Sequence, residues 1–288
     1  MKKIIVANWK MYGDQEMAKN WAAGMREHLT TNHEPRATII VCPPAALISM
    51  LKNELANLPV KIGGQDCHEQ EEGAHTGDTS AKLLKSIACE YVIVGHSERR
   101  QNHAETSALI CKKAACAIKS ELIPIICIGE TADERAKGAT ISVLTKQIAE
   151  SVPSCHPEQA AGVVKDLCEN NKNKIPHVDF MNGQDPSLRL RSAQNDKPHF
   201  ILAYEPVWAI GSGNVPNSDE IKNAHLAIIS ATSKHTGLAE AEISVLYGGS
   251  VKPENAAEIL TIEGVAGVLV GGASLKAEDF WKIAASGH

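Results

Sequence analysis

Eight short apolar segments rich in Ile and Val recur along the chain, and they constrain its fold more than any other feature. They are residues 3–9, 38–42, 60–64, 91–95, 122–129, 200–205, 243–248 and 265–271. None of them alternates cleanly between apolar and polar residues. Each is therefore expected to be a strand buried on both faces, which is typical of parallel sheets.

Segments with helical periodicity separate most of these strands. In residues 219–235 apolar side chains recur at helical spacing, and Asn217 and Glu220 form a capping motif ahead of them. Thr131 and Glu134 mark another helix start just after a strand. Strand, turn and helix repeated eight times predict an α/β protein with the (β/α)8 TIM-barrel fold, in a single domain over residues 1–288. Periodicity alone leaves a doubly wound open sheet as the alternative.

One interval between predicted strands is too long for this repeat. The fifth and sixth strands start near residues 122 and 200, and the excess lies at about 168–199, a segment rich in Asn and Pro with little steady periodicity. We interpret it as an exposed insertion before the sixth strand. Because it leads into a strand, it should emerge at the bottom of the barrel, away from the carboxyl ends of the strands.

Deletion of residues 168–199 is therefore expected to leave turnover nearly unchanged. Circular dichroism would establish that the shortened protein is folded, and a turnover assay would test its activity. Collapse of turnover in a folded deletion variant would contradict this placement.

Charge and apolar content exclude several classes of partner. The formal net charge is −5 and the isoelectric point is near 6.2, so the basic footprint of a nucleic-acid-binding protein is absent. No apolar run approaches the roughly 18 residues of a membrane span, and the apolar stretch at residues 4–7 is too short for a signal peptide. We expect a cytoplasmic protein that binds a small molecule or a protein.

The cysteine pattern does not indicate a metal site. Eight cysteines are spread along the chain without a Cys-x-x-Cys pair, and several lie inside apolar runs. Buried, reduced thiols are the expected state, and no zinc site is predicted from their spacing.

Polar and glycine residues are concentrated where the predicted strands end. They are Asn8, Lys10, His96, Ser97, Glu98, Glu205, Gly248, Gly249, Ser250, Gly271 and Gly272. In a (β/α)8 barrel the carboxyl ends of the strands carry the active site, so these side chains are expected to meet there.

Two glycine pairs follow the last two strands. Gly248 and Gly249 precede Ser250, and Gly271 and Gly272 follow the final apolar run. Glycine lets the backbone approach a ligand and aim its N–H groups at an anion. Each pair alone is weak evidence, since any tight turn uses glycine, but two pairs in these positions favour a phosphate site.

Three ionisable residues at the strand ends are candidates for chemistry. Glu205, partly desolvated by apolar neighbours, could be a general base or half of a structural ion pair. His96 could donate a hydrogen bond to a carbonyl oxygen or satisfy the core, and Lys10 could supply positive potential or be a solvated surface lysine. Residues 207–213 are apolar and glycine-containing, which suits a lid that closes over a ligand.

Five sequence motifs taken together resemble the triosephosphate isomerase family. They are residues 8–10 (NWK), 94–100 (VGHSERR), 203–213 (AYEPVWAIGSG), 247–250 (YGGS) and 269–274 (LVGGAS). The resemblance runs from residue 3 to about 285. It implies interconversion of D-glyceraldehyde 3-phosphate and dihydroxyacetone phosphate in glycolysis and gluconeogenesis, by a homodimer without metal or organic cofactor.

The resemblance also implies roles for individual residues. Glu205 resembles the base that moves a proton between adjacent carbons, and His96 the electrophile that polarises the carbonyl group. Asn8 and Lys10 resemble the residues that bind the substrate, and Glu98 resembles the carboxylate beside that lysine. Thr76 resembles the loop-tip residue that reaches the active site of the neighbouring subunit. The residues that match the phosphate cradle are Gly211, Ser250, Gly271 and Gly272.

The chain departs from the family pattern at two positions besides the insertion. His75 stands where Phe or Tyr is common in the interface loop, which bears on the strength or pH dependence of the interface. Pro216 follows the lid and is expected to stiffen its hinge. Two alternative functions are another phosphate-binding (β/α)8 enzyme and a scaffold whose insertion binds a partner.

Overall fold

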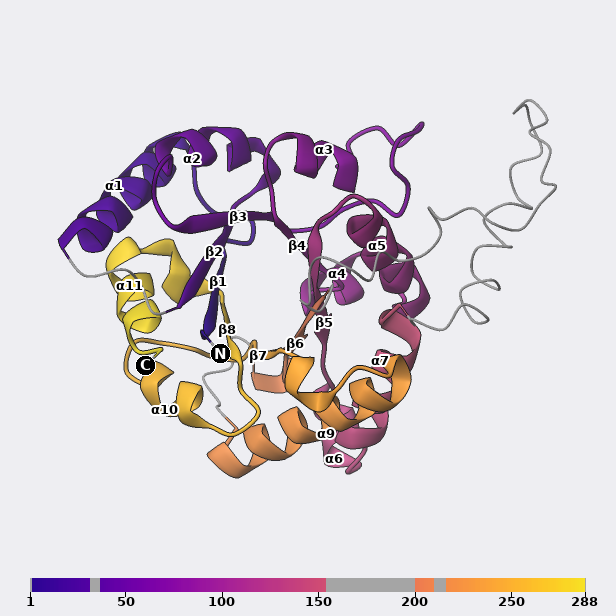
Figure 1. Cartoon of the computed structure of the whole chain (residues 1–288). Coiled ribbons are helices and arrows are strands. Elements are labelled where there is room, and N and C mark those ends of the chain that lie inside the picture. The colour runs from indigo at the N-terminus through magenta and orange to yellow at the C-terminus, as the bar shows by residue number, and fades with distance from the viewer. Residues whose placement is uncertain (1, 32–36, 154–199, 210–215, 288) are drawn as a thin grey trace.

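Eight parallel strands pair in sequence order and close into a barrel (Figure 1). The computed structural model describes residues 2–31, 37–153, 200–209 and 216–287. The strands are β1 (Ile4–Asn8), β2 (Thr38–Cys42), β3 (Val60–Gly64), β4 (Tyr91–Val94), β5 (Ile123–Ile128), β6 (Ile201–Tyr204), β7 (Val245–Tyr247) and β8 (Gly267–Val270). Pairing of Ile4 with Gly267 closes the ring between β1 and β8. The predicted TIM barrel is confirmed, and the open-sheet alternative is wrong.

Helices form the outer ring around this barrel (Figure 1). They are α1 (Gln15–Thr31), α2 (Ile48–Glu54), α3 (Ala81–Ser86), α4 (Ser97–Asn102), α5 (Ser107–Lys119), α6 (Ala132–Ala136), α7 (Thr140–Ser151), α9 (Ser218–Thr236), α10 (Ala256–Thr261) and α11 (Ala277–Ala285). Short 3-10 turns occupy η1 (Ala45–Leu47), η3 (Val207–Ala209), η4 (Glu240–Glu242) and η5 (Gly272–Leu275).

Local sequence signals set several of these boundaries. Both predicted capping boxes form: Thr131 with Glu134 begins α6, and Asn217 with Glu220 begins α9. At its other end α9 stops at Gly237, whose φ of 77° is the left-handed conformation that glycine adopts without strain. These residues satisfy backbone groups that the helices cannot pair internally, so the helix ends follow the sequence closely.

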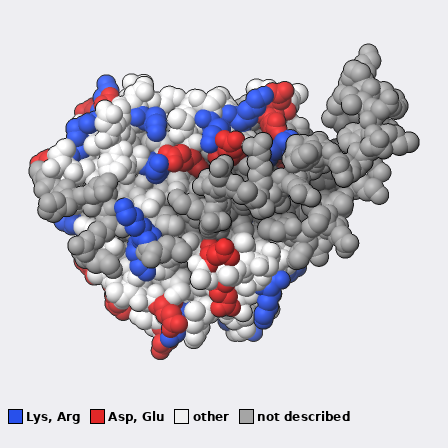
Figure 2. All heavy atoms as spheres, in the orientation of Figure 1, with Lys and Arg blue, Asp and Glu red and all other residues white. Residues whose placement is uncertain are grey.

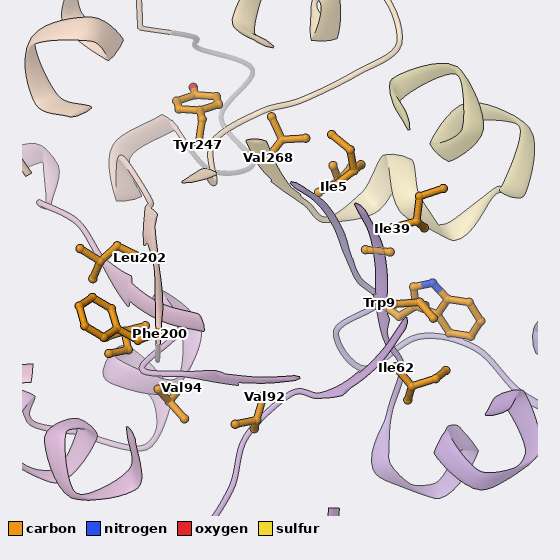
Figure 3. Close-up of a cluster of buried hydrophobic side chains, with 14 of the residues drawn as sticks. Ile5, Trp9, Ile39, Ile62, Val92, Val94, Phe200, Leu202, Tyr247 and Val268 are labelled. Carbon is orange, nitrogen blue, oxygen red and sulfur yellow. The ribbon is translucent and has the colours of Figure 1, made fainter. Parts of the chain in front are cut away.

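Seven of the eight strands bury side chains on both faces, as predicted, whereas β3 has the exposed Lys61 and the side-chain-free Gly63 on its inward face. The inward-facing set fills the barrel and consists of Val6, Ile40, Cys42, Ile93, Ile125, Cys127, Ile201, Ala203, Leu246 and Leu269. The alternate positions point outward to the helices, as Figure 3 shows for Ile5, Ile39, Ile62, Val92, Leu202 and Val268. Two apolar layers therefore hold the strands in place and fix the positions of their carboxyl ends.

Several other predictions concern residues that the structure describes only in part. The six cysteines in the described ranges carry free thiols, whereas Cys155 and Cys168 lie outside them. The predicted insertion at 168–199 also lies outside the described residues.

Among the helices that are described, none has the length and apolar character needed to cross a membrane. On the described part of the face in Figure 2, acidic and basic side chains are interspersed.

His225 on α9 is a buried histidine with one unsatisfied nitrogen. Its side chain has no solvent exposure, and its Nδ1 lies 3.2 Å from the carbonyl oxygen of Gly264, to which it donates. Its Nε2 has no hydrogen-bond partner among the described residues, and the rings of Tyr204 and Tyr247 lie nearby. Burial lowers the pKa of His225 to about 4.

This histidine is expected to make the fold sensitive to acid. Below its ordinary pKa of 6.5 the unfolded chain binds a proton that the folded chain does not, so stability falls as pH drops towards 4. Between pH 7 and pH 5 we expect the wild type to lose about 2 kcal/mol more unfolding free energy than His225→Phe, which has no imidazole. Urea unfolding at both pH values measures the difference, and equal losses in the two proteins would contradict it.

Candidate active site

A cavity of about 460 Å³ opens at the carboxyl ends of the strands. Its lining contains most of the residues predicted from the strand ends: Asn8, Lys10, His96, Glu205, Gly248, Gly249, Ser250, Gly271 and Gly272. Residues from β1, β4, β6, β7 and β8 or the loops after them thus converge on one space. The barrel brings together residues that lie up to 271 positions apart in the sequence, from Asn8 to Asp279.

Glu205 follows β6 directly and is held from several sides. It is 1% exposed, and its backbone N–H donates to the carbonyl of Ile128. Its Oε1 lies 2.9 Å from His96 Nε2, and its Oε2 accepts the Ser97 N–H at 2.8 Å. Burial raises the pKa of the Glu205 carboxyl, but the His96 imidazole and the Ser97 N–H lower it more, so the pKa lies below its ordinary value. The group is a fixed, ionised carboxylate at neutral pH.

His96 occupies the N-cap of α4 and faces Glu205. Its Nδ1 accepts the backbone N–H of Glu98 at 3.3 Å, so the ring proton of the neutral form resides on Nε2. Burial lowers the pKa of His96, but the Glu205 carboxylate raises it more, and the pKa lies above its ordinary value. In either protonation state Nε2 bears a proton that it can donate into the cavity.

Lys10 is fixed by both its backbone and its ammonium group. Its φ of 53° is rare for a residue with a side chain, and its N–H donates to Asn8 Oδ1 at 3.0 Å. Its Nζ lies 2.5 Å from Glu98 Oε1. The Gln65 amide donates to the carbonyls of Lys10 at 2.8 Å and Cys42 at 2.9 Å, which ties the loop after β1 to β2. We did not predict Gln65, although its position directly after β3 was the available signal.

The loop after β7 passes so close to Glu205 and Tyr247 that it requires glycine. A Cβ atom at Gly248 would lie 2.9 Å from Glu205 Cγ and 3.2 Å from the Tyr204 carbonyl oxygen. A Cβ atom at Gly249 would collide with the Tyr247 hydroxyl group. These glycines therefore provide space for the carboxylate as well as the flexible backbone that was predicted.

Gly248→Ala is expected to lower kcat about tenfold to 100-fold because the new methyl group displaces the Glu205 side chain, and misplacement by about 1 Å can cost 100-fold. The matched control is Gly237→Ala at the end of α9, where the φ of 77° makes alanine costly to stability but no cavity residue is touched. Steady-state kinetics and thermal unfolding of both variants separate the two effects. Equal kcat values in the two variants would contradict the steric role of Gly248.

A second cation that we did not predict lies on the cavity wall. Lys252 follows Ser250 by two residues and is exposed, and it lines the same cavity as Lys10 and Gly271. A Cβ atom at Gly271 would lie 3.3 Å from Lys10 Cε, so the loop after β8 passes close to the lysine stem. Two ammonium groups and two glycine loops give this end of the barrel the character of an anion site.

The predicted lid begins at an anchored turn. Trp208 in η3 donates from Nε1 to Glu130 Oε1 at 3.0 Å, and the Tyr204 hydroxyl donates to the same oxygen at 3.2 Å. The guanidinium of Arg135 lies 3.7 Å from the centre of the Trp208 ring. Glu130 is 1% exposed and burial raises its pKa. Sequence reasoning missed Glu130, and the predicted residue Gly211 lies outside the described ranges.

Comparison with known proteins decides the family. The family model described as triosephosphate isomerase matches residues 3–165 and 168–287. The chain belongs to the triosephosphate isomerase family. The predicted resemblance is thereby confirmed, and the alternative of a different phosphate-binding barrel family is not favoured.

Individual members of the triosephosphate isomerase family match over nearly the whole chain. The triosephosphate isomerase of Acidiphilium cryptum is 42% identical over 286 residues, covering 99% of this chain and 98% of that protein. The protein of the same name from Rhizobium etli is 38% identical, with 98% and 95% covered. A crystal structure of triosephosphate isomerase from Bartonella henselae has a TM-score of 0.76 at 32% identity and covers 99% of both chains.

Two residues singled out from the triosephosphate isomerase resemblance do not line the described cavity. Thr76 is exposed in the loop between β3 and α3 and does not line the described cavity. Pro216 is buried at the first position described after residue 209. Glu98, by contrast, lies where predicted, beside Lys10 and His96.

Proposed function

We propose that this chain interconverts dihydroxyacetone phosphate and D-glyceraldehyde 3-phosphate by proton transfer through an enediolate. The observation that carries the proposal is the contact of Glu205 with His96, at 2.9 Å, in a cavity that also holds Lys10 and two glycine loops. A base, a proton donor, a fixed cation and an anion cradle are the groups that this reaction needs. Membership of the triosephosphate isomerase family supports the same reaction.

Glu205 is the proposed base. Its carboxylate takes a proton from the carbon next to the carbonyl group. The electron pair of that C–H bond forms the new C–C double bond, and the π pair of the carbonyl bond moves onto its oxygen. The same carboxyl group then returns a proton to the neighbouring carbon. The low pKa and the Ser97 hydrogen bond keep Glu205 ionised and oriented for the first step.

His96 and Lys10 stabilise the negative charge that this step creates. The Nε2 proton of His96 is donated to the carbonyl oxygen as electrons arrive there, and the imidazole moves protons between the two enediolate oxygens. Lys10 places an ammonium charge in the same cavity, and its strained, hydrogen-bonded backbone keeps that charge in position. Asn8 supports Lys10 through its side-chain oxygen and also lines the cavity.

The phosphate group is assigned to the loops after β7 and β8. Ser250, Gly271 and Gly272 would hold it, together with Gly211 from the lid, and the exposed Lys252 adds charge at this end. The lid would exclude water and so prevent the enediolate from losing its phosphate. All of these steps move protons, and the chain's own side chains supply and accept them.

We also infer that the chain acts as a cytoplasmic homodimer with one barrel domain per subunit. Large apolar side chains beside the cavity support an interface: Met11 is 94% exposed and Tyr12 is 58% exposed. Thr76, in the exposed loop after β3, would reach the active site of the neighbouring subunit. Sedimentation equilibrium tests the assembly, and a monomer at micromolar concentration would contradict it.

The reaction itself is tested by a coupled assay of the purified chain. D-Glyceraldehyde 3-phosphate is supplied, and formation of dihydroxyacetone phosphate is followed through a dehydrogenase that consumes it. We expect rapid turnover that inorganic phosphate inhibits competitively. A folded protein without turnover would contradict the proposed function.

A further inference from the structure

Arg100 on α4 joins four elements of the barrel although it does not line the cavity. Its partly buried guanidinium donates from Nε to the Gly95 carbonyl and from Nη2 to the Cys127 carbonyl, both at 2.9 Å. Nη1 donates to Ser107 Oγ at 3.1 Å, and Nη2 also donates to Ser151 Oγ at 3.3 Å. The side chain therefore ties the loop after β4 to β5 and to the helices α5 and α7.

The two carbonyl bonds form where the ladder between β4 and β5 stops. Val94 is the last residue of β4 and pairs with Ile126, so Cys127 extends one position beyond the last pair. Gly95 follows Val94 with a φ of 69°, a left-handed conformation that glycine adopts without strain. Beyond the last pair, the guanidinium of Arg100 is the link between the two strand ends, and it sets their separation.

These strand ends carry the two groups that are proposed to move the proton. Gly95 directly precedes His96. Cys127 directly precedes Ile128, whose carbonyl accepts the backbone N–H of Glu205 at 2.8 Å. The contact of His96 Nε2 with Glu205 Oε1 at 2.9 Å completes a closed path through the guanidinium. A change in the separation of the strand ends would therefore move the imidazole relative to the carboxylate, and misplacement by about 1 Å can cost 100-fold in rate.

The same guanidinium places a fixed positive charge near Glu205. All four acceptors of Arg100 among the described residues are neutral oxygens, and an arginine side chain stays protonated in proteins. Burial lowers the pKa of Arg100, and the charge of Glu205 acts in the opposite direction, so the two groups interact. The cation accordingly favours the ionised form of the Glu205 carboxyl group.

We propose that Arg100 is a positioning residue that holds His96 and Glu205 at the separation needed for proton transfer, through the carbonyls of Gly95 and Cys127. Its effect on rate rests on the proposed function. The planar fork of the guanidinium is what the position requires, because it reaches carbonyls on two strand ends at once. An ammonium group on a flexible stem is a point charge and does not fix that geometry.

Steady-state kinetics of Arg100→Lys test the fork, because lysine keeps the charge. We expect kcat to fall about tenfold to 100-fold. Competitive inhibition by inorganic phosphate should be unchanged, since Arg100 does not contact the loops after β7 and β8. With dihydroxyacetone phosphate deuterated at its hydroxymethyl carbon, the isotope effect on kcat should rise because proton transfer becomes the slow step. Arg100→Gln, which also lacks the charge, should lose more kcat than Arg100→Lys.

Arg26→Lys is the matched control for these variants. Arg26 also donates to a backbone carbonyl, that of Glu54, but it is exposed on the outer helix α1. We expect this variant to keep the wild-type kcat and isotope effect, and thermal unfolding shows that each variant is folded. Wild-type kcat in Arg100→Lys would overturn the proposal. Phosphate inhibition that weakens as much as kcat falls would indicate general damage to the barrel and would overturn it too.

A second measurement needs no turnover, so it separates failure of this inference from failure of the proposed function. In ¹⁵N-labelled protein the Nε2 proton of His96, which faces Glu205, should give a downfield NMR signal that His96→Gln lacks. We expect Arg100→Lys to shift or broaden this signal and Arg26→Lys to preserve it. An unchanged signal in folded Arg100→Lys would overturn the positioning role, whether or not the wild type turns over.

Discussion

Replacing Glu205 with Gln is expected to lower kcat by about 10²–10⁴-fold while leaving the fold intact. Glutamine has nearly the same shape, and its amide oxygen can still accept the Ser97 N–H that now meets Oε2 at 2.8 Å. It cannot take a proton from carbon. Because the carboxylate would remove and return the proton in the same turnover, both directions of the reaction should slow together. Steady-state kinetics in each direction measure the effect.

A second carboxylate provides the control for Glu205→Gln. Glu90 Oε2 lies 2.8 Å from Lys61 Nζ on the surface, and neither residue lines the cavity. Glu90→Gln therefore removes one negative charge without changing the site. We expect that variant to keep the wild-type kcat. If Glu205→Gln retained more than about one tenth of the activity, the loss would be smaller than general-base catalysis contributes, and Glu205 would not be the base.

Lys10→Met is expected to lower kcat/KM by about 10²–10³-fold, equivalent to about 2.7–4 kcal/mol of transition-state stabilisation. Methionine preserves much of the apolar stem that packs near Gly271 but removes the charge from the cavity. It also leaves Glu98 without its ammonium partner, so one more uncompensated negative charge would lie near an anionic substrate. Competitive inhibition by inorganic phosphate should weaken in parallel.

Lys252→Met is the control that separates the specific role of Lys10 from a general loss of positive charge in the cavity. Both lysines line the cavity, but Lys252 is exposed and solvent screens its charge. Its removal should raise KM with little change in kcat. Similar kinetic losses in the two variants would show that Lys10 contributes only general attraction for anions, contrary to its proposed role beside the reacting carbonyl.

The barrel could be predicted because nearly every strand is buried on both faces, β3 with its exposed Lys61 being the exception. This arrangement leaves continuous apolar runs in the sequence, and the polar residue that ends each run marks a position on the rim. Asn8, His96 and Glu205 were found in this way, since each interrupts or follows an apolar strand. The resemblance to triosephosphate isomerases then supplied their roles, which periodicity alone did not.

Residues that position the site from a distance could not be predicted in the same way. Gln65 contacts the Lys10 carbonyl 55 positions away, and Glu130 accepts a hydrogen bond from Trp208 78 positions away. Both residues lie just after an apolar strand, which marks them as rim positions, but such pairs meet only because barrel closure brings the strand ends together. The left-handed backbone of Lys10 is likewise a product of the contacts around it. The position of such a residue can be read from the sequence, but the partner that it contacts has no local signature.

The most direct test follows the substrate hydrogen by NMR as the purified chain converts dihydroxyacetone phosphate in D₂O. If Glu205 carries the proton, its carboxyl group exchanges with solvent between the two transfers, and deuterium appears in the product on the carbon next to the aldehyde. The account predicts this labelled D-glyceraldehyde 3-phosphate with the wild type and almost none with Glu205→Gln. Conversion without any deuterium that persists in Glu205→Gln would indicate direct hydride transfer between the carbons and would contradict the account, as would a folded wild type that converts nothing.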